Sequence, residues 1–326
     1  MIPENLAGRR IAITGSTGFL GTALVERLLR SAPGCELVLI LRPGRRGAGR
    51  RVERDILRND AFDNLRSQLG TDGFAEMTSR RITAVAGDVT SDSLGLDADG
   101  LAALASCDIV IHSAAVVSFD SPLDQAVEVN LLGPVRIVET LASLGATPHL
   151  VTVSTCYVAG SRRGRAPEEP VDASSFFVDV DWRTEVDAAR RIRLDTETES
   201  RTPANLKAFR SEAHGELGAA GIPSLAAKTE QLRCRWVDDK MAQAGIARAG
   251  SLGFPDAYAF TKALGEIAVA ESAGDVPISV VRPAIIESAH SEPSPGWIRG
   301  FRMAEPVIIS YARGLLKEFP GVPEGT

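Results

Sequence analysis

The chain has few aromatic residues and few cysteines. Aromatic side chains make up 5% of its 326 residues, and only three are tyrosines, so a tyrosine within a catalytic pattern stands out. The four cysteines are spaced neither as a CxxC motif nor as a zinc ligand set, and no histidines cluster beside them. We therefore expect no metal site. We interpret the four cysteines as reduced, partly buried thiols of a cytoplasmic protein: Cys35, Cys107, Cys156 and Cys234.

Long hydrophobic runs are also missing. No apolar stretch approaches the roughly 20 residues of a membrane-spanning helix, and the N-terminus lacks the apolar core of a signal peptide. Peripheral contact with a membrane stays open. The net charge of -6 argues against a general nucleic-acid-binding protein, while 44% hydrophobic residues are typical of a globular one.

Short apolar runs alternate with helical patterns along much of the chain. Uninterrupted apolar runs of this kind predict parallel strands that are buried on both faces. Their alternation with helices, including a long one over 122–143, predicts an α/β fold with a doubly wound parallel sheet, the Rossmann fold. The predicted strands are Arg10–Thr14, Leu37–Leu41, Arg81–Ala86, Asp108–His112, His149–Val153 and Ile278–Arg282.

The alternation is interrupted by a long charged stretch. Between residues 161 and 257, 31 of 97 residues are charged, and 186–194 and 225–244 have the pattern of amphipathic helices. We therefore predict a nucleotide-binding Rossmann domain over 1–160 that returns over 257–290, with a helical, substrate-related insertion over 161–256 before the second part. Residues 291–326, with a helix over 307–318, are expected to begin a substrate-binding region that is cut short.

Glycines follow the first predicted strand with the spacing GxxGxxG. Glycine lets the backbone turn tightly and approach a pyrophosphate, which then lies at the N-terminus of the next helix. The pattern predicts a dinucleotide-binding loop, and the alternative is a tight turn without a ligand. The predicted cofactor contacts here are Gly15, Ser16, Thr17, Gly18, Phe19, Leu20 and Gly21.

The ends of the next two strands bear on the choice of cofactor. An acidic residue after the second strand would hold the ribose 2′-hydroxyl of NAD, but Arg42 stands there and four more arginines follow up to Arg51. Because guanidinium groups suit a 2′-phosphate, we predict NADPH, held by Arg42 and Arg51. The later arginines could instead form a solvated loop or meet the phosphates of coenzyme A. Asp88 and Val89 are candidates for the adenine site, and an ordinary turn is the alternative.

Tyr258 and Lys262 form a YxxxK pattern on a predicted helix. Residues four apart lie on one helix face, and we expect the ammonium to lower the pKa of the phenol so that it can transfer a proton. Thr155, after the fifth strand, would hydrogen-bond the reacting oxygen. These three are the predicted catalytic residues, and the alternative is a packed aromatic beside a solvated lysine.

Together these motifs resemble the extended short-chain dehydrogenase/reductases. Several stretches further resemble the fatty acyl-CoA reductases, the family that includes the plant male-sterility proteins. They are 15–21 (GSTGFLG), 114–120 (AAVVSFD), 153–158 (VSTCYV), 256–262 (DAYAFTK) and 282–298 (RPAIIESAHSEPSPGWI), of which the last is the most specific. The charged insertion, with Asp181-Trp-Arg183, resembles the bacterial branch.

The resemblance implies reduction of a long-chain fatty acyl-CoA by NADPH to an aldehyde, an alcohol or both, with release of CoA. It implies that Thr155 and Tyr258 hold the oxyanion, that Tyr258 supplies the proton and that Lys262 reaches the nicotinamide ribose. The resemblance also implies that four further residues belong to the cofactor site: Ala114, Ala115, Asn130 and Pro283.

Other interpretations stay open. The chain could be a thioester reductase domain acting on carrier-protein-bound acyl chains, another extended reductase or a nucleotide-sugar epimerase. A non-catalytic Rossmann protein would be expected to lose Tyr258 or Lys262. Cys156 would allow an acyl-cysteine route, but no histidine base is near it in sequence, which favours packing in the core. Because members of the family continue well beyond the PGWI segment, we expect this chain to hold mainly the reductase domain.

Overall fold

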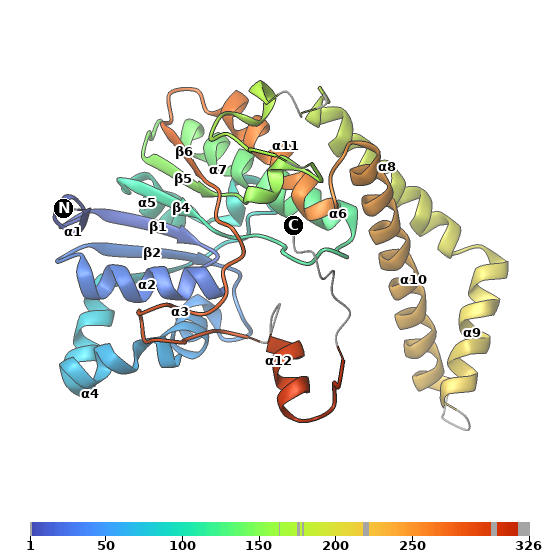
Figure 1. Cartoon of the computed structure of the whole chain (residues 1–326), viewed down its shortest axis with the longest axis horizontal. Coiled ribbons are helices and arrows are strands. Elements are labelled where there is room, and N and C mark those ends of the chain that lie inside the picture. The colour runs from blue at the N-terminus through green and yellow to red at the C-terminus, as the bar shows by residue number, and fades with distance from the viewer. Residues whose placement is uncertain are drawn as a thin grey trace.

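Six parallel strands form the centre of the described part of the protein. A computed structural model describes residues 2–162, 164–174, 177, 179–217, 222–300 and 305–318. The strands lie in the order β3-β2-β1-β4-β5-β6 (Figure 1), which confirms the predicted doubly wound sheet. Each begins and ends within one residue of its prediction: β1 Arg10–Thr14, β2 Glu36–Leu41, β3 Ile82–Ala86, β4 Ile109–His112, β5 His149–Val153 and β6 Ile278–Val281.

Helices cover both faces of the sheet because alternate strand residues point to opposite sides. Ile13 lies between Leu39 of β2 and Ile111 of β4 and packs in one core with α2, α3 and α4. Ala12 faces the other core, with α5, α7 and α11. The bounds of these helices are α2 Phe19–Ser31, α3 Gly47–Val52, α4 Asp63–Arg81, α5 Ala98–Ala105, α7 Leu132–Ser143 and α11 Ala257–Ser272.

The helix predicted over 122–143 is interrupted by a π-helical turn. The α-helix α6 covers Leu123–Ala126, the wider turn covers Val127–Leu131, and α7 follows. Helix α11 crosses this turn closely, since a Cβ atom on Gly265 would lie 2.5 Å from the carbonyl oxygen of Asn130. The sequence pattern predicts one continuous helix here, so it misses the π-helical turn.

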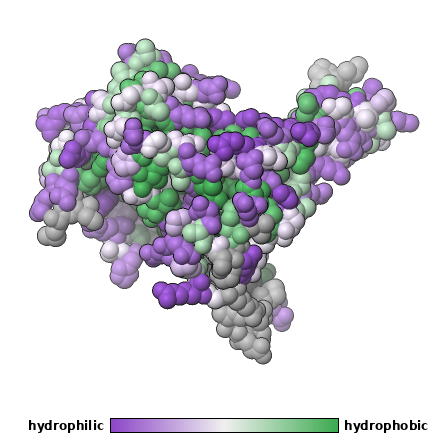
Figure 2. Space-filling model, turned by 90° about the horizontal axis from the view of Figure 1, so that it is seen from above, coloured by the Kyte–Doolittle hydropathy of each residue, from purple (hydrophilic) through white to green (hydrophobic). Residues whose placement is uncertain are grey.

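Among the described residues, three α-helices lie between β5 and α11: α8 Trp182–Ser200, α9 Pro203–Leu217 and α10 Ile222–Ser251. Trp182 and Val186 of α8 and Met241 of α10 are buried in one core with α6, α7 and α11. Helix α9 packs on α10, where Phe209 meets Trp236 at 5.9 Å between ring centroids. The α9–α10 pair forms an arm that projects from the body (Figure 1), and its outer part is mainly hydrophilic (Figure 2).

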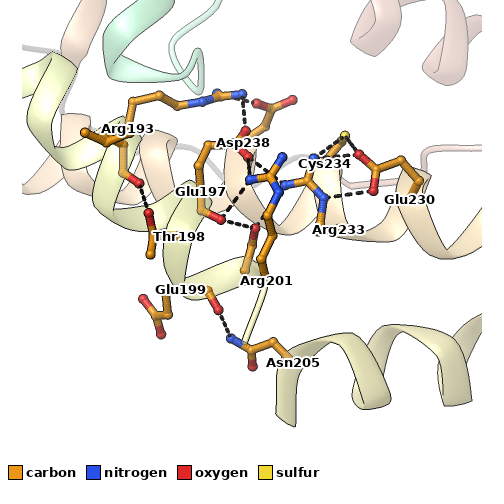
Figure 3. Close-up of polar contacts among 12 residues, drawn as sticks. Arg193, Glu197, Thr198, Glu199, Arg201, Asn205, Glu230, Arg233, Cys234 and Asp238 are labelled. Carbon is orange, nitrogen blue, oxygen red and sulfur yellow. Dashed lines mark hydrogen bonds and ion pairs between the residues drawn. The ribbon is translucent and has the colours of Figure 1, made fainter. Parts of the chain in front are cut away.

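An ion-pair network joins α8 to α10 at the base of this arm (Figure 3). The guanidinium of Arg233, which is buried, lies 2.7 Å from Glu197 Oε2 and 2.6 Å from Glu230 Oε1. Arg193 pairs with Asp238 at 2.9 Å. Because a buried guanidinium needs several partners at once, the network fixes how the two helices lie against each other.

The segment after β6 returns to α2. Trp297 is buried, stacks on Phe19 at 5.1 Å and donates its indole N–H to Asp60 Oδ1 at 2.7 Å. Arg299 donates to Thr22 Oγ1 and to the carbonyl oxygen of Asp55. The stretch that most resembles the reductase family is therefore fastened to α2, beside the glycine loop.

The predicted helix over 307–318 is wrong in its second half. Helix α12 covers Glu305–Ala312. Gly314 then takes a left-handed conformation with φ of 70°, and the Leu315 N–H bonds the Ser310 carbonyl at 2.9 Å. This is the hydrogen bond that ends a helix at a C-terminal glycine.

The shorter elements are α1 Ile2–Asn5, a π-turn at Glu53–Leu57 and 3₁₀ turns at Asp60–Phe62, Asp92–Gly95, Cys156–Ala159 and Val171–Ala173. None of the described helices has both the length and the apolar composition needed to cross a bilayer.

Candidate active site

The glycine loop between β1 and α2 forms a tight cradle. Gly15 has φ of 75°, and a Cβ atom on it would lie 2.5 Å from the backbone nitrogen of Ala114. A Cβ atom on Gly21 would lie 2.2 Å from the Gly15 carbonyl oxygen. Gly18 precedes α2 and has no side chain to cap the first turn, whose N–H groups are therefore free to meet an anion. Ser16 Oγ is buried without a hydrogen-bond partner in the described part of the chain. This cradle fits the pyrophosphate of a dinucleotide.

A cleft of about 500 Å³ lies at the carboxyl ends of the strands. It opens where the strand order reverses between β1 and β4, the usual position of a ligand in such sheets. The glycine loop forms one wall, and the ends of β4, β5 and β6 with the start of α11 form the others. The cleft brings together these residues predicted from the sequence: Gly15, Gly18, Phe19, Leu20, Gly21, Ala115, Thr155, Tyr258, Lys262 and Pro283.

Local structure fixes the three predicted catalytic side chains. Thr155 is buried, and its hydroxyl accepts the Tyr157 N–H at 3.2 Å, which anchors it at the end of β5. Helix α11 begins at Ala257 because the Asp256 carboxylate caps it, accepting the Ala259 N–H at 2.8 Å. Tyr258 and Lys262 then lie one turn apart on the face that lines the cleft.

Burial decides the protonation of these side chains. It raises the pKa of Tyr258 above its ordinary value, although hydrogen bonding to Thr155 acts in the opposite direction. Burial also lowers the pKa of Lys262 to about 8, and the ammonium donates to the Val153 carbonyl oxygen at 2.7 Å. The expectation that Lys262 lowers the pKa of the phenol was wrong: burial raises this pKa, and the cause that lowers it is the hydrogen bond to Thr155. The phenol therefore keeps its proton at neutral pH.

His112 is a buried neighbour of this site. Its Nδ1 lies 2.8 Å from Thr14 Oγ1, so it ties β4 to β1. Burial and the positive charge of Lys262 lower the pKa of His112 to about 3. The imidazole therefore stays neutral at physiological pH and does not compete with the lysine for a negative partner.

Asn130 supports the cleft from behind. Its side-chain amide accepts the Val116 N–H at 2.9 Å and donates to the Val116 carbonyl at 3.0 Å and to Thr261 Oγ1 at 3.3 Å. It is buried in the π-helical turn and outside the lining of the cleft. The structure thus places Asn130 as a positioning residue for the loop after β4.

The predicted 2′-phosphate and adenine residues lie beyond the cleft. Arg42 is exposed at the end of β2, and no described residue pairs with its guanidinium. Arg51 donates to the Arg42 carbonyl at 2.6 Å and pairs with Asp55 at 3.0 Å, so it stiffens this loop. The Asp88 carboxylate accepts the Thr90 N–H and hydroxyl within its own turn. Also outside the cleft lining are Ser16, Thr17, Val89 and Ala114.

The sequence left several apolar lining residues unassigned: Phe119, Tyr157, Ile285 and Ile286. The Phe119 ring meets Tyr258 at 6.3 Å and Tyr157 at 6.4 Å, both edge-on. All four lie in stretches that resemble the reductase family, so a signal was present. Which side chain points into the cleft depends on loop conformation, which one sequence does not show.

The expectation that Cys156 packs in the core was wrong. The 3₁₀ turn that begins at Cys156 follows β5 directly and leaves the thiol exposed. Its backbone N–H bonds the Pro283 carbonyl at 3.0 Å, and the residue lines a separate cavity of about 190 Å³ rather than the cleft. Cys234 is exposed as well, whereas Cys35 and Cys107 are buried.

Comparison with known proteins agrees with this geometry. The family model described as male sterility protein, one of NAD-binding domains, matches residues 13–325. The chain belongs to this family. A nicotinamide dinucleotide is accordingly its class of cofactor, which the glycine cradle fits.

Two relatives are similar along nearly all of this chain. Chloroplastic fatty acyl-CoA reductase 2 of Arabidopsis thaliana is 31% identical over 327 residues, which cover 98% of this chain and 48% of that protein. The alcohol-forming fatty acyl-CoA reductase of Simmondsia chinensis is 31% identical over 320 residues, which cover 97% and 59%. The chain thus spans about half to three fifths of the length of these relatives.

A solved structure supports the fold. The terminal R domain from the myxalamid PKS-NRPS biosynthetic pathway superposes with a TM-score of 0.50 at 21% identity, covering 86% of this chain and 49% of that one. At this identity the likeness shows a shared fold and leaves the substrate open.

Proposed function

We propose that this protein uses NADPH to reduce the thioester carbonyl of a long-chain fatty acyl-CoA, releasing CoA and a fatty aldehyde or alcohol. The observation that carries the proposal is the single cleft in which the glycine cradle faces Thr155, Tyr258 and Lys262. Its other walls include Phe119, Ile285 and Ile286, which suit an apolar substrate. The names of the two relatives agree with this substrate class.

The chain offers partners for each part of the cofactor. The glycine loop and the first turn of α2 would hold the pyrophosphate. Lys262 has three N–H donors, of which one binds Val153, and the others are available to the nicotinamide ribose. Ala115 and Pro283 would pack beside the nicotinamide, and Asp88 and Val89 would lie on the adenine side.

NADPH rather than NADH is favoured by the end of β2. Arg42 stands where NAD-binding sheets carry an acidic residue. Its exposed guanidinium, without a partner among the described residues, suits a 2′-phosphate. Arg51 supports the same loop through its bond to the Arg42 carbonyl and is already paired with Asp55. We therefore assign the phosphate contact to Arg42 first.

The catalytic residues act on the carbonyl oxygen. When bound, the reduced nicotinamide supplies the hydride that the carbonyl carbon accepts. Thr155 and Tyr258 donate hydrogen bonds to the oxygen as its negative charge develops. Tyr258 enters the reaction protonated, because its raised pKa keeps the proton on the phenol, and gives it to this oxygen. Lys262 stabilises the resulting tyrosinate by its positive charge. The hydroxyl proton returns to the Tyr258 oxygen as the carbonyl re-forms and the carbon–sulfur bond breaks, which yields the aldehyde and a CoA thiolate that takes a proton from water.

The test is a direct assay of the purified protein with NADPH and palmitoyl-CoA. We expect loss of NADPH absorbance together with release of free thiol; one NADPH per thiol indicates an aldehyde product, and two indicate an alcohol. If none of the acyl-CoA substrates tested, from medium to very long chains, causes NADPH consumption, the proposal is overturned. Reduction of carrier-protein-bound acyl chains in place of acyl-CoA would assign the chain to the thioester reductases instead.

A further inference from the structure

A second cavity adjoins the reaction cleft. This outer groove, of about 520 Å³, is lined by Val117, Ser118, Phe119, Asp120, Ile246, Pro255 and Asp256. Three of these residues, Val117, Ser118 and Phe119, also line the reaction cleft. The two spaces are therefore continuous along the loop after β4, with the Phe119 ring at their junction beside Tyr258.

The outer groove exposes large apolar side chains. Val117 is 47% exposed, Phe119 42% and Ile246 48%. The nearby polar groups are engaged locally: the Ser118 hydroxyl donates to Asp120, and the Asp256 carboxylate caps α11. Apolar surface gathered in a concave site is typical of a binding site for an apolar ligand.

Helix α10 holds Ile246 at a fixed position relative to the catalytic helix. A Cβ atom on Gly245 would lie 3.0 Å from Ala257 Cβ and 3.4 Å from Leu123 Cβ, so α10 rests closely on α6 and α11 here. Ala257 is the first residue of α11 and precedes Tyr258. The far wall of the outer groove thus comes from residues between β5 and α11, and its backbone packs directly against the start of the catalytic helix.

We infer that the outer groove binds the distal part of the acyl chain and that Ile246 sets chain-length preference. The inference rests on the proposed function. The reaction cleft must hold both the nicotinamide and the thioester, which fill much of its roughly 500 Å³. The remaining methylenes of a long chain leave it past Phe119, and each gains affinity when it is buried against apolar surface.

The experiment compares kcat/KM for butyryl-CoA, palmitoyl-CoA and stearoyl-CoA in three variants. Ile246→Asp places a charge in the groove, so kcat/KM for the two long substrates should fall at least ~10-fold while that for butyryl-CoA stays within about twofold. Ile246→Trp shortens the groove and should lower kcat/KM for stearoyl-CoA more than for palmitoyl-CoA. Leu194→Asp, at a 67% exposed position on α8, is the matched control and should change none of the three.

The outcomes separate this inference from the proposed function. If the wild-type protein reduces no acyl-CoA, the proposed function fails. If it does and both Ile246 variants keep the wild-type ratio between long and short substrates, the acyl-groove assignment fails alone. An equal loss for all chain lengths would also overturn it, because the groove would then affect catalysis rather than chain binding.

Discussion

Replacing Lys262 by methionine should make the protein more stable at neutral pH while it removes activity. Lys262 is buried, and its pKa lies at about 8 instead of 10.5 because the ammonium has lost its hydration. Glu266, one turn further along α11, raises the pKa and so compensates only in part. The folded protein therefore carries an unfavourable charge in its active site.

The size of the effect follows from the pKa. Each pKa unit corresponds to about 1.4 kcal/mol, so the charged lysine costs the folded state about 3 kcal/mol. Methionine has a similar length and removes this cost, but it leaves the Val153 carbonyl without its 2.7 Å donor. An unsatisfied buried acceptor costs about 1–3 kcal/mol. We expect the free energy of unfolding to rise by about 1 kcal/mol, with a melting temperature about 1–2 °C higher.

The pH dependence gives the sharper assay. Between pH 8 and 10.5 the unfolded chain keeps a proton on Lys262 that the folded chain has released. Wild-type stability therefore gains from rising pH in this window, and the variant lacks that gain. Denaturant unfolding should show the advantage of the variant at pH 7 and its steady loss towards pH 10.5. Lys207→Met, at an exposed lysine of α9, is the control and should leave the pH profile of the wild type.

Two results would refute this reasoning. A Lys262→Met protein that is less stable than the wild type at pH 7 would mean that the Val153 hydrogen bond outweighs the desolvation of the charge. An advantage that is the same at pH 7 and pH 10 would mean that the lysine has an ordinary pKa in the folded protein. Either result would show that the charged Lys262 does not destabilise the folded protein in the way that its burial implies.

Three other substitutions test the site. Tyr258→Phe should lower turnover at least ~100-fold with the cofactor dissociation constant unchanged, whereas Tyr311→Phe, at an exposed tyrosine of α12, should not; parallel loss of cofactor affinity would contradict the role as proton donor. Arg42→Ala should weaken NADPH binding ~10-fold or more with little change for NADH, measured by fluorescence titration; equal effects on both cofactors would place the 2′-phosphate elsewhere. Gly21→Ala should abolish cofactor binding, since its methyl carbon would lie 2.2 Å from a backbone oxygen, whereas Gly73→Ala has room and should bind normally; binding by both would mean that the loop can widen.

The sequence predicted the sheet well because its strands are short, uninterrupted apolar runs. Runs such as 37–41 are buried on both faces, so hydrophobicity alone marks where they begin and end. The π-helical turn at 127–131 and the early end of α12 escaped prediction. Gly265 of α11 lies close against the first, and Gly314 takes a left-handed conformation at the second.

The residues of the candidate site also include some that the sequence could predict and some that it could not. The glycine loop and the Tyr258–Lys262 pair could be found because their geometry is encoded in residue spacing along one turn or one helix. Phe119 and Ile286 could not, because tertiary structure decides which loop side chains enter the cleft. The direction of the Tyr258 pKa shift also needed the structure, since burial raises the pKa by more than the hydrogen bond to Thr155 lowers it.

The bond between Trp297 and Asp60 joins residues that are 237 positions apart. During synthesis, β1, the glycine loop and α2 leave the ribosome before the other five strands, and the indole that covers Phe19 arrives only after the helical arm and α11 have been made. A nascent chain that ends before Trp297 has its strands but leaves the Phe19 ring uncovered beside the glycine loop. The glycine loop of this protein is thus translated well before the residue that completes its surroundings.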